Sequence, residues 1–166
     1  MRKKALLIFI LIFALLLCSC QRKQQNTLEM LASLLNVSGE SLEGNGIFYY
    51  SEALEGELGY FSKADQFLMY GKDNVEHNFP KIEACAMFVS SRVPSELAIF
   101  KCYSASDTDE IERMCLERAD EIKVALYNTQ WRDKTEGIRV IAYKRYVLFS
   151  FVENGSGVER KLKELI

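Results

Sequence analysis

Histidine, tryptophan and proline are scarce in this chain of 166 residues, which contains one, one and two of them. A zinc site needs several His or Cys ligands at paired spacing. His77 and three cysteines spaced 17 and 13 positions apart do not supply such a pattern. Glycine is too infrequent for a fibrous protein, at 9 residues. The net charge of −2, with no run of five or more like charges, argues against nucleic acid as a partner.

Long apolar runs are also lacking, with one exception near the start of the chain. Residues Ala5–Leu17 are apolar throughout and follow the basic residues Arg2, Lys3 and Lys4. A basic start followed by an apolar run of this length predicts a secretory signal peptide. The run is shorter than the ~20 residues that a membrane-spanning helix needs. A membrane anchor that is retained in the mature protein is the alternative.

The end of this run resembles the bacterial lipobox, in the motif Leu17-Cys18-Ser19-Cys20. The resemblance implies cleavage between Ser19 and Cys20, because a small residue must pass through a narrow peptidase site. It also implies that Cys20 carries a diacylglyceryl thioether, since only a thiol can form that bond. Cys18 is less usual at its position. Cleavage by an ordinary signal peptidase, after Cys18 or Ala14, is the competing interpretation.

The sequence therefore predicts three segments: a lipoprotein signal peptide at 1–19, a polar tether at 20–26 and a single domain at 27–166. The processed chain has 147 residues, with 18 basic and 23 acidic side chains and hence a net charge of −5. A domain of that size can bury its own core. We expect it to sit at the cell membrane, on the extracytoplasmic face, held by acyl chains on Cys20.

Hydrophobic periodicity predicts four helices and a loop in this domain. In the longest helix Asp107 and Glu110 form the expected N-terminal capping pair, and Thr27 is the expected N-cap of the first helix. The expected helices are Thr27–Asn36, Ser62–Tyr70, Asp107–Gln130 and Val158–Ile166, and Val37–Asn45 is the expected loop.

Two β-hairpins are predicted from alternating apolar residues, beside a less regular β-prone stretch at Gly46–Phe61 with a turn at Glu55-Gly56. The first hairpin joins Glu83–Ser91 to Glu96–Tyr103. A turn centred on Val93-Pro94 would place Cys85 opposite Cys102. The face that holds both cysteines is apolar, so we assign it to the core: Cys85, Met87, Val89, Ala98, Phe100 and Cys102.

The second hairpin, Ile138–Glu153, turns at Lys144-Arg145. Its predicted core face contains Ile138, Val140, Ala142, Val147, Phe149 and Phe151, and its predicted outer face contains Arg139, Ile141, Tyr143, Tyr146, Leu148 and Ser150. The fold class that follows is α+β. We expect an antiparallel sheet built from two hairpins, covered by one long amphipathic helix and shorter terminal helices.

Residues 60–153 are similar to an uncharacterised family of Gram-positive bacterial lipoproteins, known as a domain of unknown function. The similarity lies in Val93–Lys101, in Glu117-Arg118 of the long helix and in Val140–Phe149. That family often has Gly and Asn where Lys144 and Arg145 stand here. The resemblance implies no catalytic residues beyond the lipid-bearing Cys20.

Few residues in the sequence suggest a catalytic, metal-binding or disulfide-forming role. His77 lies in a polar loop, and the sequence contains no nucleophile-elbow motif for which it could act as the base. Asp107-Thr108-Asp109-Glu110 lacks the glycine and closing glutamate of a calcium loop, so capping is the favoured role. Cys85 and Cys102, if directly opposed, could form a disulfide, and two buried thiols are the alternative. Aromatic clusters such as Phe48-Tyr49-Tyr50 fill the core or form a stacking surface.

We therefore predict no catalytic, metal-binding or cofactor-binding residues and no cofactor. The expected function is a non-enzymatic binding or accessory domain at the cell envelope. Its expected partners are the membrane, through Cys20, and an envelope protein or cell-wall component. A cell-envelope hydrolase or redox protein with an unrecognised active site is the alternative.

Overall fold

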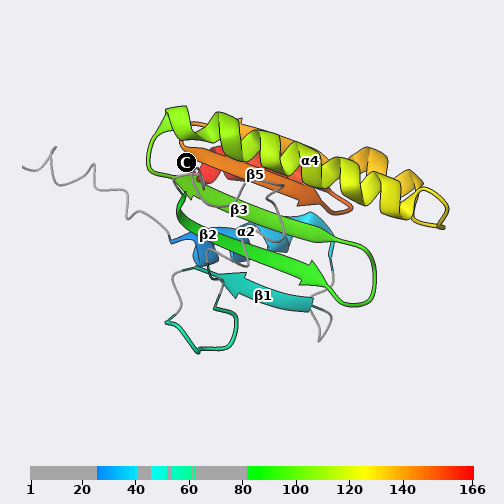
Figure 1. Ribbon diagram of the computed structural model, residues 1–166, viewed down its shortest axis with the longest axis horizontal. Coiled ribbons are helices and arrows are strands. Elements are labelled where there is room, and N and C mark those ends of the chain that lie inside the picture. Colours follow the sequence, from blue (N-terminus) through cyan, green and yellow to red (C-terminus); the bar gives the residue numbers. More distant parts are fainter. Residues whose placement is uncertain (1–25, 41–45, 52–53, 61, 63–81) are drawn as a thin grey trace, which may run out of the picture.

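The computed structural model describes residues 26–40, 46–51, 54–60, 62 and 82–166. Figure 1 shows a single sheet with helices on both sides. The elements in chain order are α2 (Thr27–Ser38), β1 (Gly46–Tyr50), β2 (Ile82–Ser90), β3 (Glu96–Cys102), the 3-10 turn η1 (Ala105–Asp107), α4 (Thr108–Leu126), the 3-10 turn η2 (Asp133–Gly137), β4 (Arg139–Tyr143), β5 (Tyr146–Phe151) and α5 (Gly155–Leu165).

The five strands form one antiparallel sheet in the order β1-β2-β3-β5-β4. Each predicted hairpin is present, and pairing between β3 and β5 joins the two into one sheet. Helix α4 packs on one face, above β4 and β5, and helices α2 and α5 pack against each other on the opposite face. The expected α+β class is confirmed, with helices in two layers around the sheet.

The register of the first hairpin differs from the prediction by two residues. Cys85 lies opposite Phe100, and Cys102 lies opposite Ile82. The cause is a longer turn: the last paired residues are Val89 and Glu96, so six residues lie outside the ladder where the predicted strands leave four, and the Ser90 amide donates to the Ser95 carbonyl within this turn. A two-residue shift keeps every side chain on its predicted face, because side chains alternate with period two.

This register places Cys85 and Cys102 diagonally on the same face rather than directly opposite. Diagonal neighbours have Cα atoms ~7–8 Å apart, which is outside the usual range for a disulfide. The three described cysteines, Cys85, Cys102 and Cys115, form no disulfide with one another in this structure. The geometric basis for the predicted Cys85–Cys102 bond is therefore absent.

The second hairpin has the predicted register and turn. Val140 lies opposite Phe149 and Tyr143 opposite Tyr146, which leaves Lys144 and Arg145 in the turn. Lys144 has a φ of 54°, and the positive φ occurs at this first turn residue only. That pattern is typical of a type II′ turn, which favours glycine at this position.

The prediction of an outer face is wrong for strand β5, whose predicted outer side chains are buried, whereas Arg139 on β4 is exposed. Helices α2 and α5 cover this face, and Tyr146, Leu148 and Ser150 are all buried. Strand β5 consequently has no exposed side, and the opposite face of β2 and β3 contributes Ala86, Phe88, Leu97 and Ile99 to this second core. The first core lies under α4 and contains the predicted set led by Met87, Phe100 and Phe149, except for Ala142, which is exposed on the edge strand β4.

The helix caps and boundaries also differ from the prediction. The side chain of Asn26, not Thr27, caps α2 by accepting from the Glu29 amide at 2.7 Å. Asp107 makes no such bond at the start of α4, because its carboxylate accepts from the amide and hydroxyl of Ser104 one turn earlier. Helix α4 ends at Leu126, short of the expected Gln130, and α2 extends two residues past Asn36 to Ser38.

In the β-prone stretch Gly46–Phe61, the strand at β1 and the turn at Glu55-Gly56 are present. Among the described residues of its second half, Tyr60 forms an isolated bridge with Tyr50. The predicted helix Ser62–Tyr70 lies outside the described residues, apart from its first residue.

Candidate functional site

A pocket opens at one end of the sheet, between the β2–β3 turn and the C-terminal half of α4. Its volume is about 290 Å³. Apolar side chains make up most of its wall, and a short row of charged side chains from β3 and α4 forms the rest. The lining residues include Val89, Pro94, Ile122, Ala125, Leu126 and Phe151 on the apolar side and Glu96, Arg118 and Glu121 on the charged side.

The charged wall centres on Arg118, which lies between two carboxylates. Its Nη2 donates to Oε2 of Glu96 at 2.9 Å, and its Nη1 lies 3.6 Å from Oε2 of Glu121. The Glu96 side chain is only 4% exposed, whereas that of Glu121 is 42% exposed. A carboxylate this deeply buried needs a cation beside it. Arg118 supplies that cation, and Glu121 adds a further negative charge at the pocket mouth.

The rim of the pocket is held by its own hydrogen bonds. The Ser90 hydroxyl accepts from the amides of Arg92 and Val93, at 3.3 and 3.4 Å. The Ser90 amide in turn donates to the Ser95 carbonyl. Pro94, which fixes its own backbone φ, completes the turn. These bonds shape the rim before anything binds.

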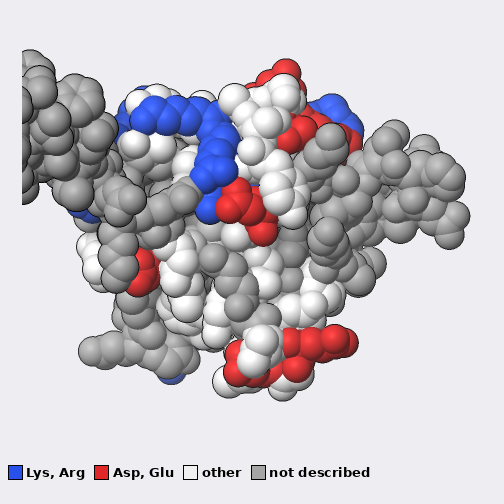
Figure 2. Space-filling model, turned by 90° about the vertical axis from the view of Figure 1, so that its left-hand side faces the viewer, with Lys and Arg blue, Asp and Glu red and all other residues white. Residues whose placement is uncertain are grey.

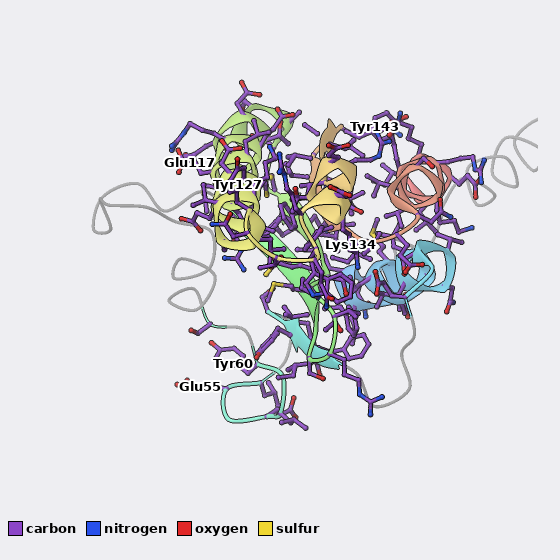
Figure 3. All side chains as sticks on the ribbon, turned by 90° about the vertical axis from the view of Figure 1, so that its right-hand side faces the viewer. Glu55, Tyr60, Glu117, Tyr127, Lys134 and Tyr143 are labelled. Atoms are coloured by element: carbon purple, nitrogen blue, oxygen red, sulfur yellow. The ribbon has the colours of Figure 1, made fainter. Side chains whose placement is uncertain are left out.

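A second polar cluster, around Glu40, lies against the same end of the sheet. Glu40 Oε2 accepts from the Ser95 hydroxyl at 3.1 Å, and its Oε1 accepts from the Lys134 ammonium at 3.2 Å and from the Glu153 amide at 3.3 Å. Lys134 also lies over the ring of Phe151, 5.4 Å from its centroid. Figure 3 looks onto this end and shows Lys134 between α4 and α2.

The Glu40 cluster is suited to holding structure rather than to acid–base chemistry. Its carboxylate already accepts from three donors, which lie in the β2–β3 turn, in η2 and two residues past the end of β5. We therefore interpret Glu40 as a tie between the end of α2 and the pocket wall.

The pocket lies at the end of the domain that is far from the start of α2. Helix α2 ends beside the pocket end, because the Ser38 carbonyl accepts from the Asn154 amide, just past the end of β5. Its 12 residues rise about 18 Å. Its first residue, Thr27, therefore lies toward the other end, where Figure 1 also shows the C-terminus.

That other end has a mixed charge. Glu83 bonds both Lys101 and Arg145, the latter at 2.8 Å. Figure 2 looks onto this end and shows basic and acidic side chains lying side by side on it. Glu83 on β2 therefore links this strand to β3 and to the β4–β5 turn.

Cys85 and Cys102 lie on the face of the sheet that α4 covers, Cys115 lies on α4 itself, and all three are buried. Burial raises the pKa of the Cys102 thiol to about 11, and the Asp107 carboxylate adds to the rise while Arg145 opposes it. Burial likewise raises the pKa of Cys115 well above its ordinary value, with a further contribution from Glu96. Thiolates are the reactive form of cysteine. Both side chains therefore behave as small apolar groups of the core.

Several residues singled out by the sequence lie outside the described part of the chain: Ser19, Cys20 and His77. Asp107, Asp109 and Glu110 begin α4, where Asp107 belongs to the cap of η1. Within the described ranges, no group of three acidic, His or Cys side chains is placed to hold a metal ion. The same residues include no helix that is both long and apolar enough to cross a bilayer.

Sequence reasoning did not find the pocket. The pair Glu96–Arg118 joins positions 22 apart, and nothing in the periodicity of either segment links them. The one available signal was a glutamate at the first position of a strand whose next four residues are apolar. A carboxylate that is buried at such a position needs a cation beside it. Comparison with known proteins adds no guide, because no family model, no curated protein and no solved structure matches the chain.

Proposed function

We propose that this chain is a lipid-anchored extracytoplasmic protein whose domain binds an envelope partner through the pocket between α4 and the β2–β3 turn. The observation that carries the proposal is the pocket itself, in which the buried carboxylate of Glu96 is paired with Arg118 beside a mostly apolar wall. Concave apolar sites with a few fixed polar groups are typical of ligand and partner sites.

The anchor rests on the sequence motif that ends at Cys20. Each buried methylene contributes about 0.8 kcal/mol to membrane binding, and one chain alone holds a protein only marginally. A thioether-linked diacylglycerol supplies two chains, which is enough for a stable anchor. The polar residues Gln21–Asn26 then span at most about 20 Å between the lipid and α2.

The place of the pocket suits such an anchor. The tether would join the domain at Thr27, and the pocket lies at the opposite end of the sheet. A partner could therefore bind the pocket without competing with the bilayer for the same surface. This arrangement favours a binding or accessory role toward proteins or wall components above the membrane.

The anchor is tested by the mass of the N-terminal peptide from membrane-extracted protein. We expect a peptide that starts at Cys20 and carries the mass of a diacylglyceryl group, and we expect Cys20→Ala to leave the chain unprocessed. A peptide that begins before Cys20, or an unmodified Cys20, would contradict the anchor.

The binding site is tested by filling the pocket. Ala125 lines the pocket and is exposed, so Ala125→Trp should occupy the space without disturbing the core. Asp120→Trp is the matched control, since Asp120 lies on the outer side of the same helix with its side chain 76% exposed. We expect crosslinked complexes from intact cells to be lost in Ala125→Trp and kept in Asp120→Trp. The same complexes in both variants would refute the pocket as the binding site.

A further inference from the structure

We infer that the pocket receives a segment of a partner protein in which an apolar side chain stands next to a lysine or arginine. The inference rests on the proposed function, since it names the chemistry of what the same pocket binds. It follows from three properties of the described lining: its charge, its size and the surface beside it.

The charge of the lining favours a cation. Glu96 and Glu121 contribute two negative charges and Arg118 one positive charge, which leaves the charged wall at −1. Arg118 lies closer to Glu96 than to Glu121, at 2.9 against 3.6 Å. A basic side chain at the mouth could therefore approach Glu121 while Arg118 keeps its bond to Glu96. A phosphate or carboxylate would face both glutamates and meet repulsion.

The size of the pocket limits the occupant to one or two side chains. A volume of about 290 Å³ is at the lower end of the range for small-molecule sites, which begins at about 300 Å³. The walls from Val89, Ile122 and Phe151 suit an unbranched or γ-branched apolar side chain. An extended peptide can insert one such side chain and leave its neighbour at the charged mouth.

The surface beside the pocket continues the apolar character. Val124 is 78% exposed and follows Glu121 by three positions on α4. The two side chains are therefore direct neighbours on the helix surface. Residues flanking the inserted side chain would thus find apolar contacts outside the pocket.

The experiment measures binding of three capped, fluorescently labelled hexapeptides to the full-length protein in detergent micelles. The peptides are identical except for a central Leu-Lys, Leu-Glu or Ser-Lys pair. We expect Leu-Lys to bind about fivefold tighter than Leu-Glu, which is the scale of one partly exposed ion pair. We also expect Ser-Lys to bind more weakly than Leu-Lys, because the pocket wall is apolar. Equal binding of all three, or no binding of Leu-Lys, would overturn the inference.

Variants at the pocket mouth assign the preference to one residue. Glu121→Gln should remove the preference for Leu-Lys over Leu-Glu, and Glu121→Lys should reverse it. Asp120→Asn removes the same unit of charge from the outer side of α4, and should leave the preference unchanged.

The outcomes separate this inference from the proposed function. If Ala125→Trp abolishes crosslinking in cells but the Glu121 variants leave peptide preference unaltered, the basic–apolar segment is wrong and the pocket remains the binding site. If Ala125→Trp leaves crosslinking intact, the proposed site itself fails.

Discussion

The hydroxyl of Ser95 donates a hydrogen bond to the carboxylate of Glu40 at 3.1 Å, across 55 positions of the chain. Ser95 lines the pocket, and Glu40 follows Gly39 just after the end of α2. The same carboxylate holds Lys134 and the Glu153 amide. One acidic side chain therefore connects the first helix, the pocket wall and the last strand.

We expect Glu40→Ala to lower the free energy of unfolding by about 2–3 kcal/mol. The Lys134 side chain is only 16% exposed, so the change leaves a mostly buried ammonium without its carboxylate. Urea unfolding followed by circular dichroism measures the effect. Glu164→Ala is the control, because Glu164 is 55% exposed in its pair with Lys161 and should cost less than about 0.5 kcal/mol. Equal losses of unfolding free energy in both variants would show that the contacts of Glu40 do not stabilise the fold.

The buried ion pair in the pocket wall predicts an asymmetric response. Arg118→Ala removes the cation next to the buried carboxylate of Glu96 and should cost about 3 kcal/mol of unfolding free energy. The double change Arg118→Met with Glu96→Leu should cost less than Arg118→Ala, because it removes both charges together. Arg113→Ala, at an exposed pair with Glu117, serves as the control and should cost under about 1 kcal/mol. A double variant that is the least stable of the three would contradict this account.

The β4–β5 turn contains a strained residue that can be relieved. Lys144 has a φ of 54°, where residues with a side chain are disfavoured and glycine is not. We expect Lys144→Gly to raise the free energy of unfolding by about 0.5–1 kcal/mol relative to Lys144→Ala. That comparison is matched, because both variants lose the bond from Lys144 to the Ile166 carbonyl and the contact with Tyr143. Thermal unfolding of the pair provides the measurement, and an alanine variant at least as stable as the glycine variant would argue against strain.

The buried thiols predict a loss of stability in alkali. Because the pKa of Cys102 is raised to about 11 and that of Cys115 well above its ordinary value, the folded state keeps protons that the unfolded chain releases above about pH 8.5. Their contribution is fully present below that pH and is lost as pH rises. The slope is about 1.4 kcal/mol per pH unit for each thiol. Urea unfolding at pH 8, 9 and 10 should show it, with a shallower slope in Cys102→Ala. Identical slopes in the variant and the parent would show that the Cys102 thiol does not contribute to the loss of stability.

Residue patterns were sufficient for the elements whose two faces differ or whose turns are short. In the β4–β5 hairpin a two-residue turn was sufficient to predict the register, and Val140 does lie opposite Phe149. The alternation did not predict that both faces of β5 are buried. The β2–β3 hairpin shows the limit of the same reasoning. Registers that differ by two residues place the same side chains on the same face, so the pattern could not choose between Cys102 and Phe100 as the partner of Cys85. The hydrogen bonds of Ser90 decided it.

By itself the sequence determined the α+β class, the long helix, both hairpins and the motif around Cys20, because each depends on residues close together in the chain. Only the tertiary structure decided that the second face of the sheet is buried, since α2 and α5 must first pack together to cover it. It also decided which charges meet. Glu40 with Lys134, and Glu96 with Arg118, are separated by 94 and 22 positions. The residue pattern of either segment does not predict such pairs. Charges far apart in the sequence come together only through the way the helices pack on the sheet.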